Sequence, residues 1–154
     1  KPFIFGYRIS PEEIKEPGIM IEDTLQLVAK LKEQGLDYIH VSTNKWTQGS
    51  VRDLYETTPV VQRIQEHVGK DFPIIGVGSI ITPDDAVETM ALGIPLVAIG
   101  RELVVEPDWI QKVKLGNETA IRKKIKPEYR EDLTLPDAMW EYIESRPGWF
   151  PIVD

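Results

Sequence analysis

Two short segments, each an apolar run that leads into a glycine, hold the residues best suited to bind a phosphate. They are residues 74–80 (IIGVGSI) and residues 96–101 (LVAIGR). Glycine lets a ligand approach the main chain closely, and free main-chain N–H groups are good phosphate donors. Arg101 adds a planar, permanently charged group. The alternative is that the glycines only make tight turns. The segments therefore predict a phosphate site that comprises Gly78, Ser79, Ile80, Gly100 and Arg101.

The rest of the chain alternates between strand-like and helix-like patterns, and these elements must position the glycines. Strands are predicted over residues 3–8, 36–41, 72–77 and 96–99. Helices are predicted over residues 21–34, 59–68, 82–91 and 107–115. Regular β-then-α alternation is typical of a parallel sheet, and four such units make half of a (β/α)8 TIM barrel. We expect an α/β half-barrel over residues 1–116 and a peripheral helical or irregular tail over residues 117–154.

A half-barrel by itself leaves two unpaired apolar sheet edges, which proteins normally cover. The chain is therefore expected to need the missing half, to form a homodimer through the open edges, or to rearrange. It starts with Lys1-Pro2 and runs directly into an apolar strand, without an initiator methionine. This start is typical of a piece of a longer protein, although processing could also produce it.

Composition excludes several classes of function. The net charge is −7, which disfavours a nucleic-acid partner, and the short basic run Arg122-Lys123-Lys124 is expected to be a solvated helix face. The chain has no cysteine, so disulfides, thiolate nucleophiles and cysteine-ligated metals are excluded. No apolar run approaches 18 residues and no signal-peptide pattern opens the chain, which predicts no membrane partner and a cytoplasmic protein.

Four motifs together resemble one enzyme family. They are residues 6–13 (GYRISPEE), 37–42 (DYIHVS), 76–80 (GVGSI) and 98–103 (AIGREL), the last followed by Pro107-Asp108-Trp109. In order and spacing they resemble barrel strands five to eight of the old yellow enzyme family of FMN-dependent oxidoreductases, in its bacterial NADH:flavin oxidoreductase branch. The resemblance covers nearly the whole chain.

The resemblance implies FMN as cofactor, NAD(P)H as reductant and an enone-like or other electron-poor substrate. Arg8 would face the pyrimidine edge of the flavin and stabilise the negative charge of the reduced ring. The alternative for Arg8 is a structural ion pair with Glu12 or Glu13. The main-chain N–H groups of Ser79, Ile80, Gly100 and Arg101 would hold the FMN phosphate.

The family's catalytic histidine pair and tyrosine proton donor lie on the N-terminal half, so no catalytic residue is assigned in this chain. The resemblance therefore implies an enzyme, but this chain alone is expected to be inactive. Neither histidine is expected to bind metal, and no metal site is predicted. His40 is expected to be a core histidine satisfied by a neighbour, and His67 a surface residue. Trp46 is interpreted as a packing anchor or a flavin neighbour.

Three alternatives remain open from the residues alone. Arg146 in the tail could lie on the surface or, as in some relatives, reach a neighbouring subunit's active site. The glycine-arginine pattern also suits half-barrels similar to dihydroorotate dehydrogenase or histidine-biosynthesis enzymes, although residues 7–12 argue against them. The remaining hypothesis is a non-catalytic scaffold in which the glycines only make turns.

Overall fold

The computed structural model describes residues 3–153, which divide into two compact units, one up to Ala98 and one from Ile99 onward. This boundary lies upstream of the division expected between residues 116 and 117. The physical reason is that Val105, only six residues after the boundary, is buried in the hydrophobic cluster of the second unit.

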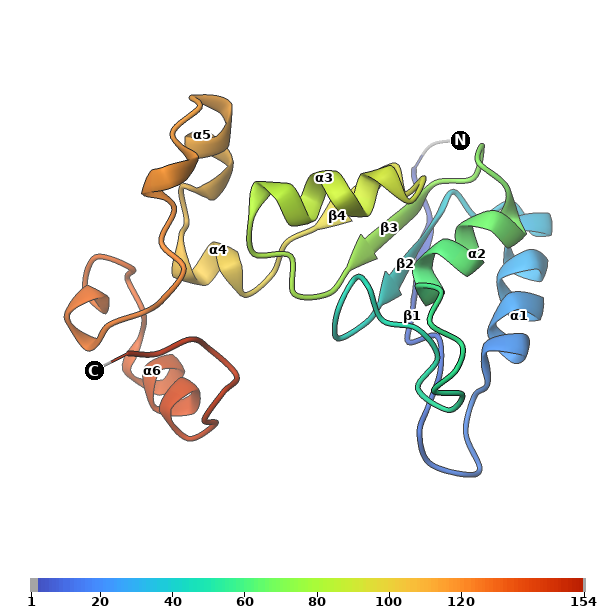
Figure 1. The fold of residues 1–154 in the computed structure, drawn as a ribbon, viewed down its shortest axis with the longest axis horizontal. Helices are drawn as coiled ribbons and strands as arrows, with labels where there is room; N and C mark the ends of the chain where they lie inside the picture. Colours follow the sequence, from blue (N-terminus) through green and yellow to red (C-terminus); the bar gives the residue numbers. More distant parts are fainter. Residues whose placement is uncertain (1–2, 154) are drawn as a thin grey trace. The chain divides into compact units, whose positions relative to one another are not determined.

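The helices and strands alternate along the first unit and become short in the second (Figure 1). In chain order they are β1 (Gly6–Ile9), α1 (Ile21–Glu33), β2 (Tyr38–Ser42), α2 (Val60–Val68), β3 (Ile74–Val77), α3 (Pro83–Ala91), β4 (Leu96–Ala98), α4 (Glu102–Val105), α5 (Trp109–Lys114), the 3-10 turns η1 (Glu118–Ala120) and η2 (Pro127–Tyr129), and α6 (Asp137–Glu144). The eight predicted strands and helices are confirmed, with ends that differ by up to three residues, whereas α4 was not predicted.

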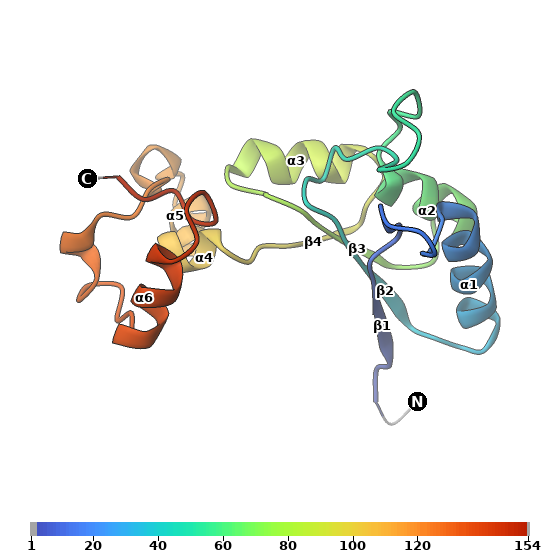
Figure 2. The same ribbon diagram turned by 90° about the horizontal axis from the view of Figure 1, so that it is seen from below.

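The four strands form one parallel sheet in the order β1-β2-β3-β4. This order, with a helix after each of the first three strands, confirms the predicted α/β architecture of a partial (β/α)8 barrel. The side chains of β2 alternate between two faces of the sheet. Ile39 and Val41 are fully buried, whereas Tyr38, His40 and Ser42 are only partly buried. Figures 1 and 2 show α1 and α2 on the same side of the sheet.

The core of the first unit lies between the sheet and its helices. Its members are the aliphatic and aromatic side chains Ile9, Ile21, Val28, Leu36, Ile39, Val41, Val60, Val61, Ile64, Val68, Phe72, Ile74 and Ile94. A Cβ atom on Gly76 would contact Val61 of α2 and Thr89 of α3, at 3.5 Å each. Helices α2 and α3 therefore cover the same face of β3, and within the described part of the first unit the opposite face of the sheet carries no helix.

The predicted start of α3 is confirmed in detail. The hydroxyl of Thr82 accepts a hydrogen bond from the N–H of Asp85, and the Asp85 carboxylate accepts one from the N–H of Thr82 at 2.7 Å. This reciprocal capping box satisfies N–H groups that the first helical turn would otherwise leave unpaired. It also fixes the direction in which the chain leaves the turn after β3.

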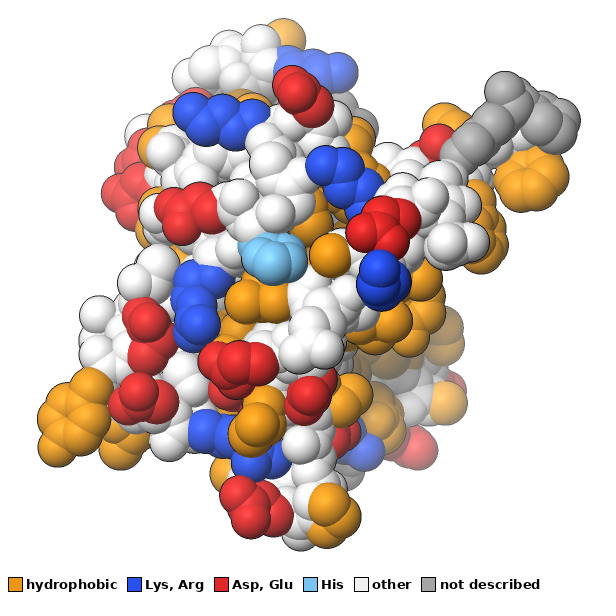
Figure 3. Space-filling model, turned by 90° about the vertical axis from the view of Figure 1, so that its right-hand side faces the viewer, with side chains coloured by type: hydrophobic (Ala, Val, Ile, Leu, Met, Phe, Trp, Pro, Cys, Tyr) orange, Lys and Arg blue, Asp and Glu red, His pale blue; other side chains and the backbone are white. Residues whose placement is uncertain are grey.

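The second unit has its own smaller hydrophobic cluster. Six residues form it: Val105, Ile125, Leu133, Trp140, Ile143 and Phe150. Short helices and 3-10 turns surround this cluster. No helix in the described part of the chain is long and apolar enough to cross a membrane. On the side of the molecule shown in Figure 3, acidic and basic side chains are interspersed rather than gathered into a field of one sign.

Candidate functional site

Arg8 lies on the face of the sheet opposite the one that the helices of the first unit cover. It pairs in register with His40, while its neighbour Ile9 pairs with Val41 and is buried in the core. The Nη2 atom of Arg8 donates a hydrogen bond to the Oγ of Ser42 at 2.9 Å. Arg8 makes no ion pair with any residue from 3 to 153. The alternative of an ion pair with Glu12 or Glu13 is therefore not found, and the Arg8 side chain is exposed.

His40 stands beside Arg8 on the same face. Burial, and then the positive charge of Arg8, lower the pKa of His40 below its ordinary value. Its Nε2 atom is buried and has no hydrogen-bond partner among the described residues, so the expected neighbouring group is not found at this atom. A neutral imidazole is the form that this position favours. His67 is exposed on α2, as predicted.

Gly78 follows β3 where the chain packs tightly against the loop after β2. A Cβ atom at Gly78 would lie 2.6 Å from the main-chain carbon of Lys45 and 2.7 Å from the hydroxyl of Thr43. The carbonyl of Gly78 accepts a hydrogen bond from the N–H of Trp46 at 2.9 Å. Packing alone thus requires glycine here, so this residue is not by itself a sign of a phosphate.

Ser79 and Ile80 continue this turn. Ser79 has a positive φ of 47° and its hydroxyl donates to the carbonyl of Asn44 at 2.7 Å. The Ile80 side chain is buried, and the Ile80 N–H donates to no acceptor within residues 3–153. The next two N–H groups, of Ile81 and Thr82, donate to the Asp85 carboxylate. Ile80 is therefore the residue of this turn whose N–H is best placed to serve a ligand.

Gly100 and Arg101 begin the second unit, directly before α4. No part of that unit comes within 4 Å of the position where a Gly100 side chain would stand, so packing within the unit does not require glycine there. The Nη1 atom of Arg101 donates to the carbonyl of Trp149 at 2.8 Å. Arg101 is exposed and its guanidinium is oriented by a neighbour from the tail.

Trp46 and Arg146 each contact other side chains of their own unit. The Trp46 side chain hydrogen-bonds to Asp85, one of several contacts that outweigh the effect of burial and lower the pKa of that carboxyl. Arg146 stacks on the ring of Tyr142, with 4.1 Å between the guanidinium carbon and the ring centroid, and lies 5.8 Å from Trp149. The Trp46 side chain is half-buried, and Arg146 contacts aromatic rings of its own tail.

A pocket that the sequence did not reveal lies at the carboxyl ends of β1 and β2. Its volume is about 560 Å3. It is lined by Ser10, Pro11, Glu12, Glu13, Ile14, Lys15 and Pro17 from the loop after β1, and by Ser42, Thr43, Asn44, Gln48 and Val51 from the end of β2 and the loop after it. Sites of α/β barrels lie at this end of the strands. No three His, Asp or Glu side chains among residues 3–153 are grouped so that they could hold a metal ion.

Comparison with known proteins identifies the family. Residues 2–120 match the model of the NADH:flavin oxidoreductase / NADH oxidase family. The chain belongs to this family. Its members are enzymes, and membership implies FMN as cofactor and NADH as reductant. The resemblance of the four motifs to the NADH:flavin oxidoreductase family is therefore confirmed.

The chain is similar to segments of larger relatives. It is 41% identical over 152 residues to the probable NADH-dependent flavin oxidoreductase YqiG of Bacillus subtilis, covering 99% of this chain and 41% of that protein. It is 34% identical to the NADH:fumarate oxidoreductase of Klebsiella pneumoniae and 36% identical to the NADH:acrylate oxidoreductase of Vibrio harveyi. Those matches cover 91% and 92% of this chain, and 15% and 14% of the relatives.

Proposed function

We propose that this chain is the FMN-binding, C-terminal part of an NAD(P)H-dependent flavin oxidoreductase that reduces electron-poor alkenes. The family match over residues 2–120 carries the proposal. The names of two relatives support the substrate class, because fumarate and acrylate are both alkenes conjugated to a carboxylate. Bound FMN would supply the hydride-transfer chemistry, between NAD(P)H and the alkene.

The residues of the first unit fit parts of such a cofactor. Arg8 presents an exposed guanidinium that has no acidic partner within residues 3–153, on the face of the sheet opposite the helices of the first unit. We propose that this charge lies near the flavin ring and stabilises its reduced form. The N–H of Ile80, with Gly78 and Ser79 shaping the turn, is proposed as a donor to the FMN phosphate. In the second unit Gly100 and Arg101 are proposed as a phosphate-binding segment in their own right.

The chain alone is proposed to be inactive. The resemblance implies that the family's substrate-anchoring histidine pair (or histidine–asparagine pair) and its tyrosine proton donor lie on the N-terminal half of the barrel. Of the two histidines in this chain, His67 lies exposed on a helix. The open sheet supports the same conclusion, since Phe3, Ile4 and Phe5 beside β1 expose 60% or more of their surface. We propose that the remaining units of a whole barrel, or a second copy of the chain, cover this edge.

FMN titration into the chain, followed by flavin fluorescence quenching, tests the cofactor assignment. Saturable binding of FMN but not of riboflavin is expected if the phosphate contacts are preformed. Binding of neither would mean that these contacts need the rest of the barrel. In the whole protein, Arg101→Leu should weaken FMN binding, and Lys114→Leu, which also removes an exposed positive charge, should not. Unchanged FMN affinity in Arg101→Leu would show that the phosphate assignment is wrong.

Light scattering tests the edge. If the open edges pair two copies, the isolated chain runs as a dimer, whereas a monodisperse monomer excludes the second copy as the cover.

A further inference from the structure

The loops after β1 and β2 are joined by two side chains that cross in opposite directions. The first is Glu12, from the loop after β1. Its Oε2 accepts a hydrogen bond from the Oγ of Ser50 at 2.9 Å and one from the N–H of Val51 at 2.5 Å. The same Ser50 oxygen accepts from the N–H groups of Arg52 and Asp53, at 3.1 and 2.9 Å. Glu12 therefore orders the turn of the second loop that presents Arg52.

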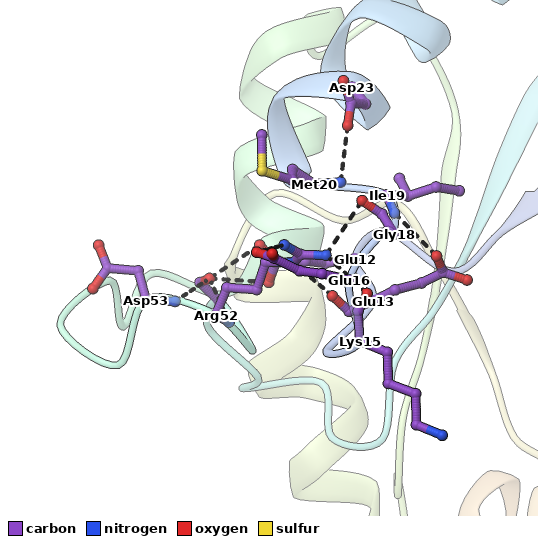
Figure 4. A network of polar contacts seen from close by, with 11 residues as sticks. Glu12, Glu13, Lys15, Glu16, Gly18, Ile19, Met20, Asp23, Arg52 and Asp53 are labelled. Atoms are coloured by element: carbon purple, nitrogen blue, oxygen red, sulfur yellow. Dashed lines mark hydrogen bonds and ion pairs between the residues drawn. The ribbon is translucent and has the colours of Figure 1, made fainter.

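The second crossing side chain is Arg52, from the loop after β2 (Figure 4). Its Nε donates to the carbonyl of Glu13 at 2.6 Å. Its Nη2 donates to the carbonyls of Lys15 and Gly18, at 3.1 and 3.2 Å, and its Nη1 to the Oε1 of Glu16 at 3.1 Å. One planar guanidinium thus holds three main-chain carbonyls of the loop after β1, in an arrangement that a lysine cannot reproduce.

The main-chain contacts are the stabilising part of this arrangement. The Arg52 side chain is only 17% exposed, whereas Glu16 is 84% exposed, so their ion pair is screened by solvent and contributes little. Gly18 lies so close to the loop that a Cβ there would stand 2.2 Å from the carbonyl of Lys15 and 3.0 Å from Arg52. The loop fits around the guanidinium and leaves no space for a side chain at that position.

These two loops are the walls of the 560 Å3 pocket at the carboxyl ends of β1 and β2. Glu12, Glu13 and Lys15 line it from one loop, and Asn44, Gln48 and Val51 from the other. A pocket of this size can admit a small organic ligand. Its shape depends on the distance between the two loops, which Glu12 and Arg52 set.

We propose that Glu12 and Arg52 are positioning residues for the oxidoreductase reaction: they hold the two loops at the separation that admits the reacting end of NAD(P)H and the alkene. The inference rests on the proposed function, because it assumes that the pocket faces the reaction. Neither side chain needs to touch the substrate. Their loss widens or collapses the pocket and weakens binding of both substrates, while the flavin and the hydride-transfer step remain.

The test uses four variants in the whole flavoenzyme, with bound flavin, kcat and KM measured for both substrates. Arg52→Gln should raise both KM values about tenfold and change kcat by less than about twofold, with flavin content retained. The KM values of Arg52→Lys should fall between those of the unchanged protein and those of Arg52→Gln, because lysine keeps the charge but bonds to fewer carbonyls. Glu12→Gln should raise KM in the same direction but less. Arg63→Gln is the matched control, since Arg63 contacts its acidic partners only at 3.9 Å.

Amide hydrogen exchange of the isolated chain supplies a second measurement that needs neither flavin nor turnover. Arg52→Gln should speed exchange at Glu13 and Ile19, whose N–H groups are bonded within the loop after β1. Unchanged KM in Arg52→Gln, or an equal rise in Arg63→Gln, overturns the proposal. If Arg52→Gln does not fold, Glu12→Gln decides in the same way. A whole protein without bound flavin overturns the proposed function instead, while the exchange result still shows whether Arg52 holds the loop.

Discussion

The units before and after the Ala98–Ile99 boundary each surround a hydrophobic cluster, but different interactions stabilise them. In the first unit the cluster consists mainly of isoleucine and valine from strands and helices that repeat along the chain. In the second, aromatic residues and a buried carboxylate take a larger share. Trp149 packs edge-on against both Tyr142 and Phe150, with ring centroids 5.1 and 4.7 Å apart.

Glu106 is the polar centre of the second unit. Its side chain is completely buried, and its Oε2 accepts hydrogen bonds from the Nζ of Lys112 and, at 3.0 Å, from the N–H of Arg122. Burial by itself raises the pKa of this carboxyl, but the hydrogen bonds from Lys112 and Arg122 outweigh burial and hold the pKa below its ordinary value. One carboxylate thus joins α5 and the segment after η1 to the end of α4.

The comparison shows two ways of specifying a structure. Backbone ladders and aliphatic burial are spread over many residues of the first unit, so the pattern matters more than any one polar group. The second unit has few ladders, and individual side chains join its short elements. The two units should therefore differ in their response to substitution. Removing one apolar side chain tests the stability of the first unit, and removing one charge tests that of the second.

The largest effect is expected for Ile39→Ala in β2. Ile39 is fully buried, and removing its outer carbons leaves a cavity beneath α1 and α2 that costs about 2–5 kcal/mol of unfolding free energy. Urea unfolding followed by far-ultraviolet circular dichroism measures it. Ile14→Ala, at a side chain that is 75% exposed, is the control and should change stability by less than about 0.5 kcal/mol. Equal effects at both positions would contradict the assigned core.

Glu106→Gln should be nearly as damaging in the second unit. It removes the charge that pairs with Lys112 and Arg122, which costs about 3 kcal/mol for a buried pair. Tryptophan fluorescence during urea unfolding is a suitable probe, because three of the four tryptophans (Trp109, Trp140 and Trp149) belong to this unit. Glu118→Gln removes an exposed carboxylate and should leave the transition in place. If Glu106→Gln lowers the free energy of unfolding by less than about 0.5 kcal/mol, Glu106 is not the polar centre of this unit.

Thr82→Ala should cost about 1 kcal/mol through the loss of the N-cap of α3. The hydroxyl that accepts from the Asp85 N–H is removed while the backbone stays the same. Thermal unfolding of Thr82→Ala beside Thr47→Ala, at an exposed loop position, isolates the cap. A loss of stability in Thr47→Ala of the same size would assign the effect to the general loss of threonine.

The smallest effect is a dependence of stability on pH through His40. Because the folded state lowers the pKa of His40, the unfolded chain binds more protons at mildly acidic pH. The contribution of His40 is complete above the unfolded value of about 6.5 and is lost as the pH falls from there toward the folded pKa. His40→Gln should reduce the change of the urea midpoint between pH 7.5 and pH 5.5. An unchanged slope in His40→Gln would show that another group titrates.

Helix and strand positions were predictable because each depends on neighbours in the chain. The Thr82-Pro83 start of α3 and its end at residue 91 follow from local capping and from the glycine at 93. The four-residue α4 was missed because its apolar residues are too few to show a period. Its Val105 is buried in a cluster whose members extend along the chain to Phe150, and sequence spacing does not reveal that cluster.

For the candidate site, the sequence by itself determined the family, the parallel α/β order and the segments that bear Arg8, Gly78 and Arg101. Those features depend on residue types and their order along the chain, which the sequence itself contains. Only the tertiary structure decided that Gly78 is required by the approach of residues 43–46 and that Arg8 bonds to Ser42 rather than to an acid. It also brought Glu12 to Ser50 and Arg52 to the loop after β1. Such contacts join residues more than thirty positions apart, and parallel pairing of β1 with β2 brings their loops together only after the sheet has formed.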